Sequence, residues 1–143
     1  TTTAPVPSTA TAGTFYYYVS QKDDLTTCES NRDTLTVLIN PLPVAPTVAD
    51  VTYCADEANP SALTAQVTMS SVPTGNTLQW YTSATGGTAS TTAPIPSTIN
   101  ASNTTPVTLE YWVSQKVDGT GCEGPRAKIT VTINPRPLPP VVA

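Results

Sequence analysis

Histidine is absent from the 143 residues of this chain, and lysine and arginine together number only six. Without histidine there is no Ser-His-Asp triad and no histidine-containing zinc site. A net charge of −4 argues against nucleic acid and anionic membranes as partners, because both require basic patches. No glycine-rich phosphate loop is present. These absences predict that the chain is not an enzyme and that it needs no cofactor.

Long apolar runs are missing as well. None approaches the roughly 20 residues needed to cross a bilayer, so we expect no membrane insertion. Only 11% of the residues are charged, whereas threonine fills 28 positions and proline 15. Threonine favours strands because its branched Cβ fits a pleated surface, and its hydroxyl keeps the outer face wet. This composition predicts an extracellular protein rich in strands.

An internal repeat determines the domain organisation. Residues 17–41 align without a gap with residues 111–135, 94 positions later, and 15 of these 25 residues are identical. A shorter match upstream has an offset of 89, so the second copy carries five extra residues. A repeat of roughly 90 residues fits a β-sandwich domain of about 100. We therefore assign residues 1–46 to the C-terminal half of one domain and residues 47–143 to a complete domain.

Alternation of apolar and polar residues predicts short strands and no helix in the complete domain. The last strand has the clearest alternation, with Ile129, Val131 and Ile133 pointing inward. Trp80 is predicted to lie in the core, because alternation places it on the same face of its strand as Leu78. The expected strands are 47–53, 62–69, 77–82, 107–117 and 127–134, with a weak edge segment at 89–95.

Proline-rich stretches, 40–46 and 134–140, lie at the two equivalent domain boundaries. Proline at alternate positions favours extended polyproline II, which makes a semi-rigid linker. The half domain at 1–46 lacks its opening strands, which would leave sheet edges unpaired. We expect neighbouring repeats, or identical subunits that exchange strands into a polymer, to complete it.

Three cysteines predict one disulfide within the chain. Cys28 and Cys122 are copies of each other, so Cys54 is the partner left for Cys122 in the same domain. A bridge closing about 70 residues would stabilise the domain by about 4 kcal/mol in the chain-entropy model. Cys28 would stay unpaired, or pair with a counterpart of Cys54 in a preceding repeat or another subunit. The alternative is that Cys54 and Cys122 are free, buried thiols.

Three aromatic residues are predicted to point outward. Strict alternation turns Trp112, Tyr18 and Tyr16 away from the core. Aromatic side chains of this kind stack on sugar rings or pack between domains, so these three are candidates for a glycan or interdomain contact. The alternative is that long side chains on adjacent strands cover them.

Acidic residues are expected to gather at the disulfide end of the domain. Extracellular modules hold weakly bound Ca²⁺ at interdomain joints with such clusters. No loop has EF-hand spacing, so solvated carboxylates are the simpler interpretation and we predict no resident metal. The residues concerned are Asp50, Asp56, Glu57, Asp118 and Glu123.

Seven short segments, taken in order, resemble the Ig-like repeats of very large cell-surface and secreted proteins of Bacteroidetes. The resemblance implies an all-β fold of Ig-like β-sandwich repeats joined by proline-rich linkers. It also implies a location outside the cell or on its surface, often reached by the type IX secretion route. The segments are 53–54 (YC), 78–81 (LQWY), 86–88 (GGT), 93–98 (APIPST), 111–115 (YWVSQ), 122–123 (CE) and 131–135 (VTINP).

Repeat, composition and resemblance together predict a structural or adhesive function. The chain would be a segment of an extracellular filament, stalk or surface adhesin built from tandem Ig-like domains. The alternative is a carbohydrate- or protein-binding accessory module of a secreted multidomain protein. That alternative requires exposed aromatic residues clustered on one face.

Overall fold

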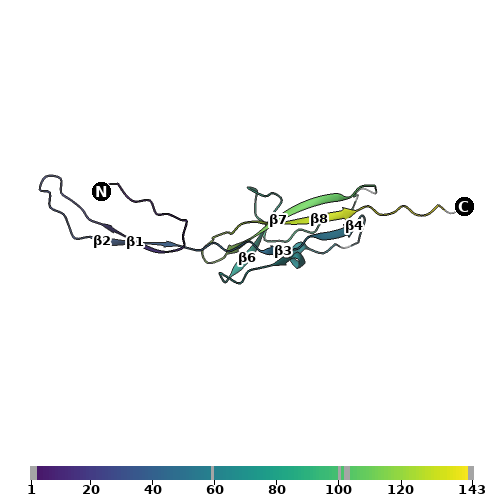
Figure 1. Ribbon diagram of the computed structural model, residues 1–143, viewed down its shortest axis with the longest axis horizontal. Helices are drawn as coiled ribbons and strands as arrows, with labels where there is room; N and C mark the ends of the chain where they lie inside the picture. Colours follow the sequence, from purple (N-terminus) through teal and green to yellow (C-terminus); the bar gives the residue numbers. More distant parts are fainter. Residues whose placement is uncertain (1–2, 59, 100, 102–103, 142–143) are drawn as a thin grey trace. The chain divides into compact units, whose positions relative to one another are not determined.

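The computed structural model describes residues 3–58, 60–99, 101 and 104–141 (Figure 1). The chain divides into two compact units, Thr1–Pro41 and Leu42–Ala143, which are described separately below. The proline-rich residues 42–46 fall in the second unit. Among the described residues, no helix has the length and apolar character to cross a membrane.

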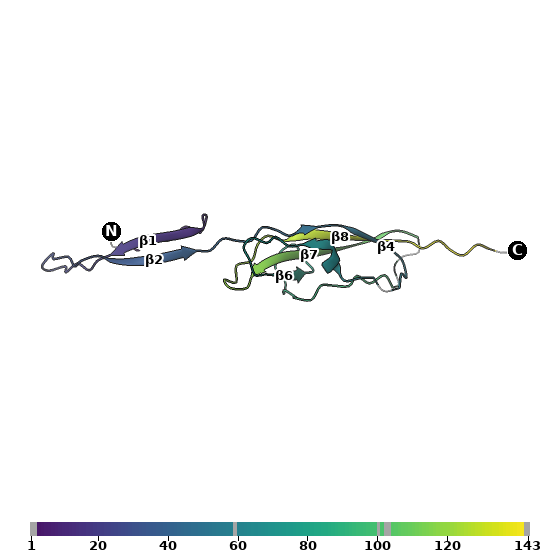
Figure 2. The ribbon, with the colours of Figure 1, turned by 90° about the horizontal axis from the view of Figure 1, so that it is seen from below.

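The first unit is a hairpin of two antiparallel strands, β1 (Gly13–Val19) and β2 (Asp33–Ile39). They form a two-stranded sheet, drawn as the arrows labelled β1 and β2 in Figures 1 and 2. A ribbon of two strands has no second layer against which to bury its apolar side chains. Those side chains are accordingly exposed: Phe15, Tyr16, Tyr18, Val19, Leu35 and Leu38.

The second unit is built on a four-stranded sheet with the order β4-β8-β7-β6. Strands β6, β7 and β8 are antiparallel neighbours, whereas β4 runs parallel to β8. Ile129, Val131 and Ile133 are fully buried, which confirms the alternation expected for the last strand. The strands are β4 (Val51–Cys54), β6 (Asn76–Tyr81), β7 (Val107–Val117) and β8 (Ala127–Asn134).

A smaller layer covers the inner face of this sheet. It contains the two-stranded ribbon of β3 (Thr47–Val48) and β5 (Val67–Thr68), and the 3₁₀ turn Leu63–Gln66. The strand predicted over 62–69 is therefore wrong for most of its length. Leu63 fills the core from the 3₁₀ turn, and its backbone N–H donates to Pro94 O. Alternation over so short a stretch cannot distinguish a strand from a turn that buries one leucine.

Two other expected strands also differ from the structure. The strand predicted over 47–53 is interrupted at Ala49, where the chain passes from the β3–β5 ribbon to the four-stranded sheet. The edge segment predicted over 89–95 pairs only at Ser90, which exchanges two backbone hydrogen bonds with Trp80. The unit remains an all-β sandwich, with Trp80, Tyr53, Leu63 and Val113 in one core.

The incoming chain keeps a constant parallel register beside β8. The Thr130 backbone N–H donates to Asp50 Oδ1, and the Arg136 side chain donates to Asp56 O. In each pair the two residues are 80 positions apart. Close packing of the incoming chain reaches back to Gly124, 81 positions after Pro43, where an added Cβ would lie 2.1 Å from Pro43 O. The segment from Pro43 onward is therefore packed into the domain.

This unit has two ends, each named here for one residue. The "Pro43 end" contains Pro43 and the β7–β8 turn, residues 118–126. The "Asn134 end" contains Asn134 and Cys54, which face each other in the β4–β8 pair. The chain joins the unit at the first end and leaves it at the second (Figure 1).

Replacing Gly124 by alanine should destabilise the second unit, because the new methyl group would overlap the Pro43 carbonyl. Overpacking of this kind costs about 1–3 kcal/mol of unfolding free energy. Both tryptophans, Trp80 and Trp112, lie in this unit, so urea unfolding followed by tryptophan fluorescence reports on it alone. Gly119→Ala is the matched control, since nothing lies within 4 Å of the position that its Cβ would take. Equal loss in both variants would contradict the close packing of Pro43.

Candidate functional site

A polar cluster at the Pro43 end is formed largely by residues that recur in both copies of the repeat. Glu123 Oε1 accepts hydrogen bonds from Tyr81 Oη and Ser114 Oγ, each at 2.5 Å. The Arg126 guanidinium lies 3.2 Å from the centroid of the Tyr81 ring. Its Nη1 also donates to the carbonyl oxygens of Ser83 and Gly86. The cluster thus ties β6, β7, the β7–β8 turn and the 83–86 turn together.

The first unit repeats part of this cluster. Ser20 Oγ donates to Glu29 Oε1 at 2.5 Å, as Ser114 does to Glu123. Arg32 occupies the position equivalent to Arg126. Identity of the serine and the glutamate in the two copies therefore reflects a shared hydrogen bond between the strand and the turn that follows it.

Contacts within the cluster set the protonation states of Glu123 and Tyr81. Burial by itself raises the pKa of Glu123, but the hydrogen bonds from Ser114 and Tyr81 outweigh it, aided by the Arg126 and Lys116 charges. The net result is a pKa below the usual value of 4.5. The pKa of Tyr81 is raised, by burial first and by the Glu123 hydrogen bond second. Glu123 is therefore an anion and Tyr81 a neutral donor at neutral pH, as a structural ion cluster requires.

Gln115 is the second polar anchor at this end. Its side chain is fully buried. Nε2 donates to Val44 O and Oε1 accepts from the Ser70 backbone N–H, both at 2.8 Å. One amide group thus joins the linker, β7 and the loop after β5. The repetition of Val-Ser-Gln-Lys at 19–22 and 113–116 marks Gln115 as a residue of interest. It does not reveal the hydrogen-bond partners Val44 and Ser70, because both are distant in sequence.

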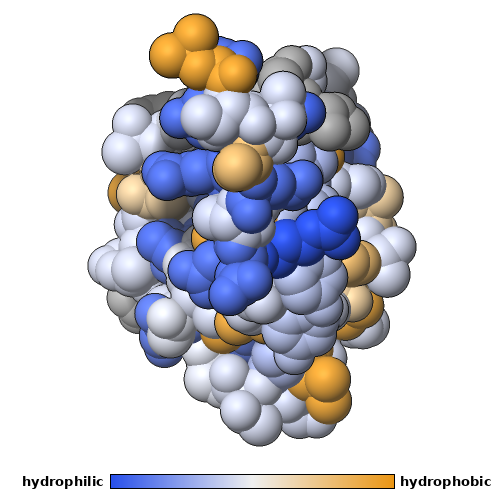
Figure 3. Space-filling model, turned by 90° about the vertical axis from the view of Figure 1, so that its left-hand side faces the viewer, coloured by the Kyte–Doolittle hydropathy of each residue, from blue (hydrophilic) through white to orange (hydrophobic). Residues whose placement is uncertain are grey.

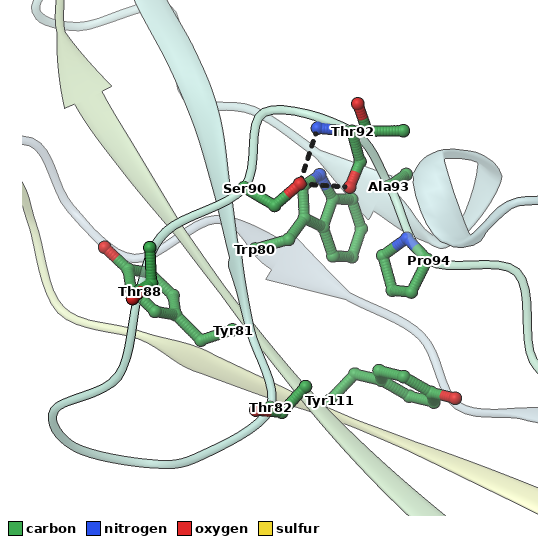
Figure 4. A pocket seen from close by; sticks show the side chains of 9 residues that line it. All are labelled: Trp80, Tyr81, Thr82, Thr88, Ser90, Thr92, Ala93, Pro94 and Tyr111. Atoms are coloured by element: carbon green, nitrogen blue, oxygen red, sulfur yellow. Dashed lines mark hydrogen bonds between the residues drawn. The ribbon is translucent and has the colours of Figure 1, made fainter.

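A shallow groove of about 340 Å³ opens at the β6 edge of the sandwich (Figure 4). Trp80 lies beside Ser90 and Ala93, and only 3% of its surface is exposed, so it presents no face for stacking. Ser90 Oγ binds the backbone of Thr92, which fixes the rim. The pKa of Tyr111 is raised by burial. The described lining contains no carboxylate or cation: Trp80, Tyr81, Thr82, Thr88, Ser90, Thr92, Ala93, Pro94 and Tyr111.

A larger hollow, of about 560 Å³, lies at the Asn134 end. Asp56 and Glu57 contribute its charged groups. Prolines and isoleucines make up much of the remaining wall, and no nucleophile paired with a base is found among its described lining residues.

Comparison with known families identifies the sandwich. The family model described as "Ig-like domain CHU_C associated" matches residues 43–135. The chain belongs to this Ig-like family. None of the curated proteins compared with the chain matches it. The matched segment begins at Pro43, the residue packed against Gly124, so the Ig-like domain includes linker residues that the repeat boundaries had placed outside it.

The predicted aromatic residues do not form one site. In the Ig-like domain, Trp112 is only half exposed and faces Tyr81 and Lys128 on the neighbouring strands. Tyr16 and Tyr18 are 60% and 65% exposed, on β1 of the first unit. The exposure of the two tyrosines does not test the predicted alternation, because Phe15 and Val19 on the other face of the same ribbon are exposed too. Side chains on the neighbouring strands partly cover Trp112.

The expected gathering of acidic residues is wrong. Asp118 and Glu123 lie at the Pro43 end of the Ig-like domain, whereas Asp56 and Glu57 follow Cys54 at the Asn134 end. Asp50 lies between them and accepts a hydrogen bond from Thr130. No group of three metal-ligating side chains occurs among the described residues. The parallel direction of β4, which alternation does not reveal, separates these carboxylates.

The predicted Cys54–Cys122 disulfide is also corrected by the strand directions. All three cysteines are free, Cys28 and Cys54 being exposed. Cys54 pairs with Asn134 at one end of β8, whereas Cys122 precedes Ala127 at the other end. A strand of this length separates them by on the order of 20 Å. A disulfide needs Cα atoms about 4.4–6.8 Å apart, so these two cysteines cannot join within one Ig-like domain.

Replacing Gln115 by leucine should lower the unfolding free energy of the Ig-like domain by about 2 kcal/mol, because Val44 O and the Ser70 N–H would lose their buried partner. Urea unfolding followed by tryptophan fluorescence measures this change. Gln66→Leu, at a partly exposed position of the 3₁₀ turn, is the matched control. An unchanged urea midpoint for Gln115→Leu would contradict the anchoring role.

Glu123 should make the stability of the Ig-like domain depend on acid. Because its folded-state pKa is below 4.5, its contribution is complete above that pH and is lost as the pH falls through the folded-state value. The urea concentration at the unfolding midpoint should therefore decrease as the pH is lowered from roughly 6 to 3. Glu123→Gln should lower the midpoint at neutral pH and flatten this fall.

Glu110→Gln serves as the comparison for that experiment. It removes an exposed ion pair with Lys128, which contributes little to stability. Its acid profile should therefore parallel that of the unsubstituted chain. If Glu123→Gln kept the full acid dependence, the cluster would not be the source of it.

Proposed function

We propose that this Ig-like domain is a force-resisting spacer in a cell-surface or secreted protein. It would form a structural segment of a filament, stalk or adhesin made of tandem Ig-like domains. Membership of the Ig-like family supports a surface location, and the domain's termini at opposite ends suit a linear array. The protein would act by holding length under tension and not by catalysis.

The observation that carries this proposal is the parallel pairing of β4 with β8. β4 lies close to the start of the domain and β8 at its end, and the two strands are direct neighbours. Tension applied to the two termini would pull them in opposite directions along their common axis. All the hydrogen bonds between them would then bear load together, whereas a peeled pair breaks one bond at a time. Additional bonds of Asp50 and Arg136 extend the same contact.

We also propose that residues 1–41 are the closing hairpin of another Ig-like domain. The support is its identity with the β7–β8 hairpin and the shared serine–glutamate hydrogen bond. Strands equivalent to β4 and β6 would then pair with its two edges, and a layer equivalent to the one that contains Leu63 would cover Leu35, the counterpart of the buried Ile129. A neighbouring repeat, or an identical subunit that exchanges strands, would supply them.

A role as a carbohydrate- or protein-binding module has less support. Such a module needs an open aromatic platform or a continuous apolar patch. Trp80 and Tyr81 are buried, and Trp112 is partly covered. The face of the molecule seen in Figure 3 is mainly hydrophilic, with small apolar areas separated from one another. These features favour the spacer.

Single-molecule pulling tests the spacer proposal. Stretched from its two termini, the Ig-like domain should unfold in one high-force event, because the β4–β8 bonds resist together and forced unfolding is controlled by the unfolding barrier. In a Cys28→Ser, Cys122→Ser variant, force applied between the exposed Cys54 thiol and the C-terminus should peel β4 from β8 at clearly lower force. Equal forces in the two geometries, or a weak event in both, would refute the force-resisting role.

A further inference from the structure

The two cysteines of the Ig-like domain lie at opposite ends of β8, one at each of its joints. Cys54 is exposed at the Asn134 end, and its backbone N–H donates to Glu57 Oε2. Cys122 lies in the turn at the Pro43 end and is partly exposed. Neither thiol can reach the other, yet each lies where an adjoining repeat would begin or end. Cys28 occupies the same turn position in the other copy of the hairpin.

The register beside β8 indicates what each cysteine would face in a tandem array. Residues of the incoming segment pair with residues 80 positions later, and Pro43 lies against Gly124. The offset of 80 places Leu42 beside Cys122, and the contact of Pro43 with Gly124 agrees with this placement to within one residue. The repeat offset of 94 makes Leu42 equivalent to Arg136 of the next joint.

At that next joint, the two kinds of cysteine would meet. Cys54 faces Asn134 in the strand register. The residue equivalent to Cys122 in the following repeat would lie beside Arg136. Both cysteines thus flank the same short stretch of chain, about one or two strand spacings, roughly 5–10 Å, apart. A small bend at the joint brings them to disulfide distance.

We propose that a disulfide joins Cys54 of one repeat to the Cys122 position of the following repeat. The bond forms by thiol–disulfide exchange with a low-molecular-weight disulfide such as glutathione disulfide. One cysteine thiolate attacks that disulfide and releases one glutathione thiol; the second cysteine thiolate attacks the mixed disulfide and releases the other. Two cysteine thiols and one glutathione disulfide thus give one protein disulfide and two glutathione thiols.

This proposal rests on the tandem arrangement of the proposed spacer and adds a covalent bond across each joint. It accounts for free cysteines at both ends of a domain that cannot pair them internally. It also gives Cys28 the same partner type as Cys122, a cysteine at the Asn134 end of the repeat before it. Such a bond would restrict bending at the joint.

A chain with two complete repeats tests the proposal. Residues 1–134 followed by residues 41–143 of a second copy preserve the Asn-Pro joint between repeats. After equilibration in a glutathione redox buffer, alkylation and peptide mass mapping should show one disulfide. It should join Cys54 of the first complete repeat to Cys122 of the second, because the short joint gives these thiols a high effective concentration. The original chain, treated alike, should keep all three thiols.

Serine substitutions provide the matched controls. Cys54→Ser in the first complete repeat should abolish the disulfide, whereas the same change in the second should leave it intact. Free thiols throughout, or a bond between Cys54 and Cys122 of one repeat, would overturn the proposal. Tryptophan fluorescence of the same samples checks that the repeats are folded. The single-molecule pulling that tests the force-resisting role is done on the reduced chain, without any disulfide. The absence of the disulfide would therefore overturn this proposal and leave the force-resisting role unaffected.

Discussion

The parallel contact between the incoming chain and β8 is the constraint on which the rest of this Ig-like domain depends. From Val51 to Asp56 the chain follows residues 131–136 at a constant offset of 80, and Pro43 packs against Gly124 at the other end of the unit. A parallel pair requires both strands to run from the same end of the sheet. The domain's termini are therefore forced to opposite ends, and this single arrangement fixes the shear geometry, the position of the linker and the separation of the cysteines.

The polar residues shared by both copies of the repeat support that contact from the side. Gln115 holds the linker through Val44, while Glu123 and Arg126 fix the turn against β6. Each is a buried or partly buried polar group with its partners in place, and removing one partner would leave others unsatisfied. The close approach of Pro43 needs a glycine at 124, since no side chain fits there. These repeated polar residues therefore have a structural role, which is to hold the domain and its own linker together.

The same geometry changes the role of the cysteines. Within one domain they are about a strand's length apart, so a bridge would require the sheet to be dismantled. Across a joint, the repeat places complementary cysteines beside the same few residues. A head-to-tail contact of this kind is heterologous and generates a linear assembly, as the proposed spacer requires.

The sequence by itself determined the β class, the repeat, the inward face of β8 and the burial of Trp80, because local alternation and self-similarity carry that information. It did not determine the direction of β4, the 3₁₀ turn at Leu63 or the partners of Gln115. These depend on contacts between residues far apart in the chain, and a parallel strand has the same alternation as an antiparallel one. The tertiary structure alone decided that Cys54 and Cys122 lie at opposite ends, since only strand direction separates two residues that the repeat assigns to one domain.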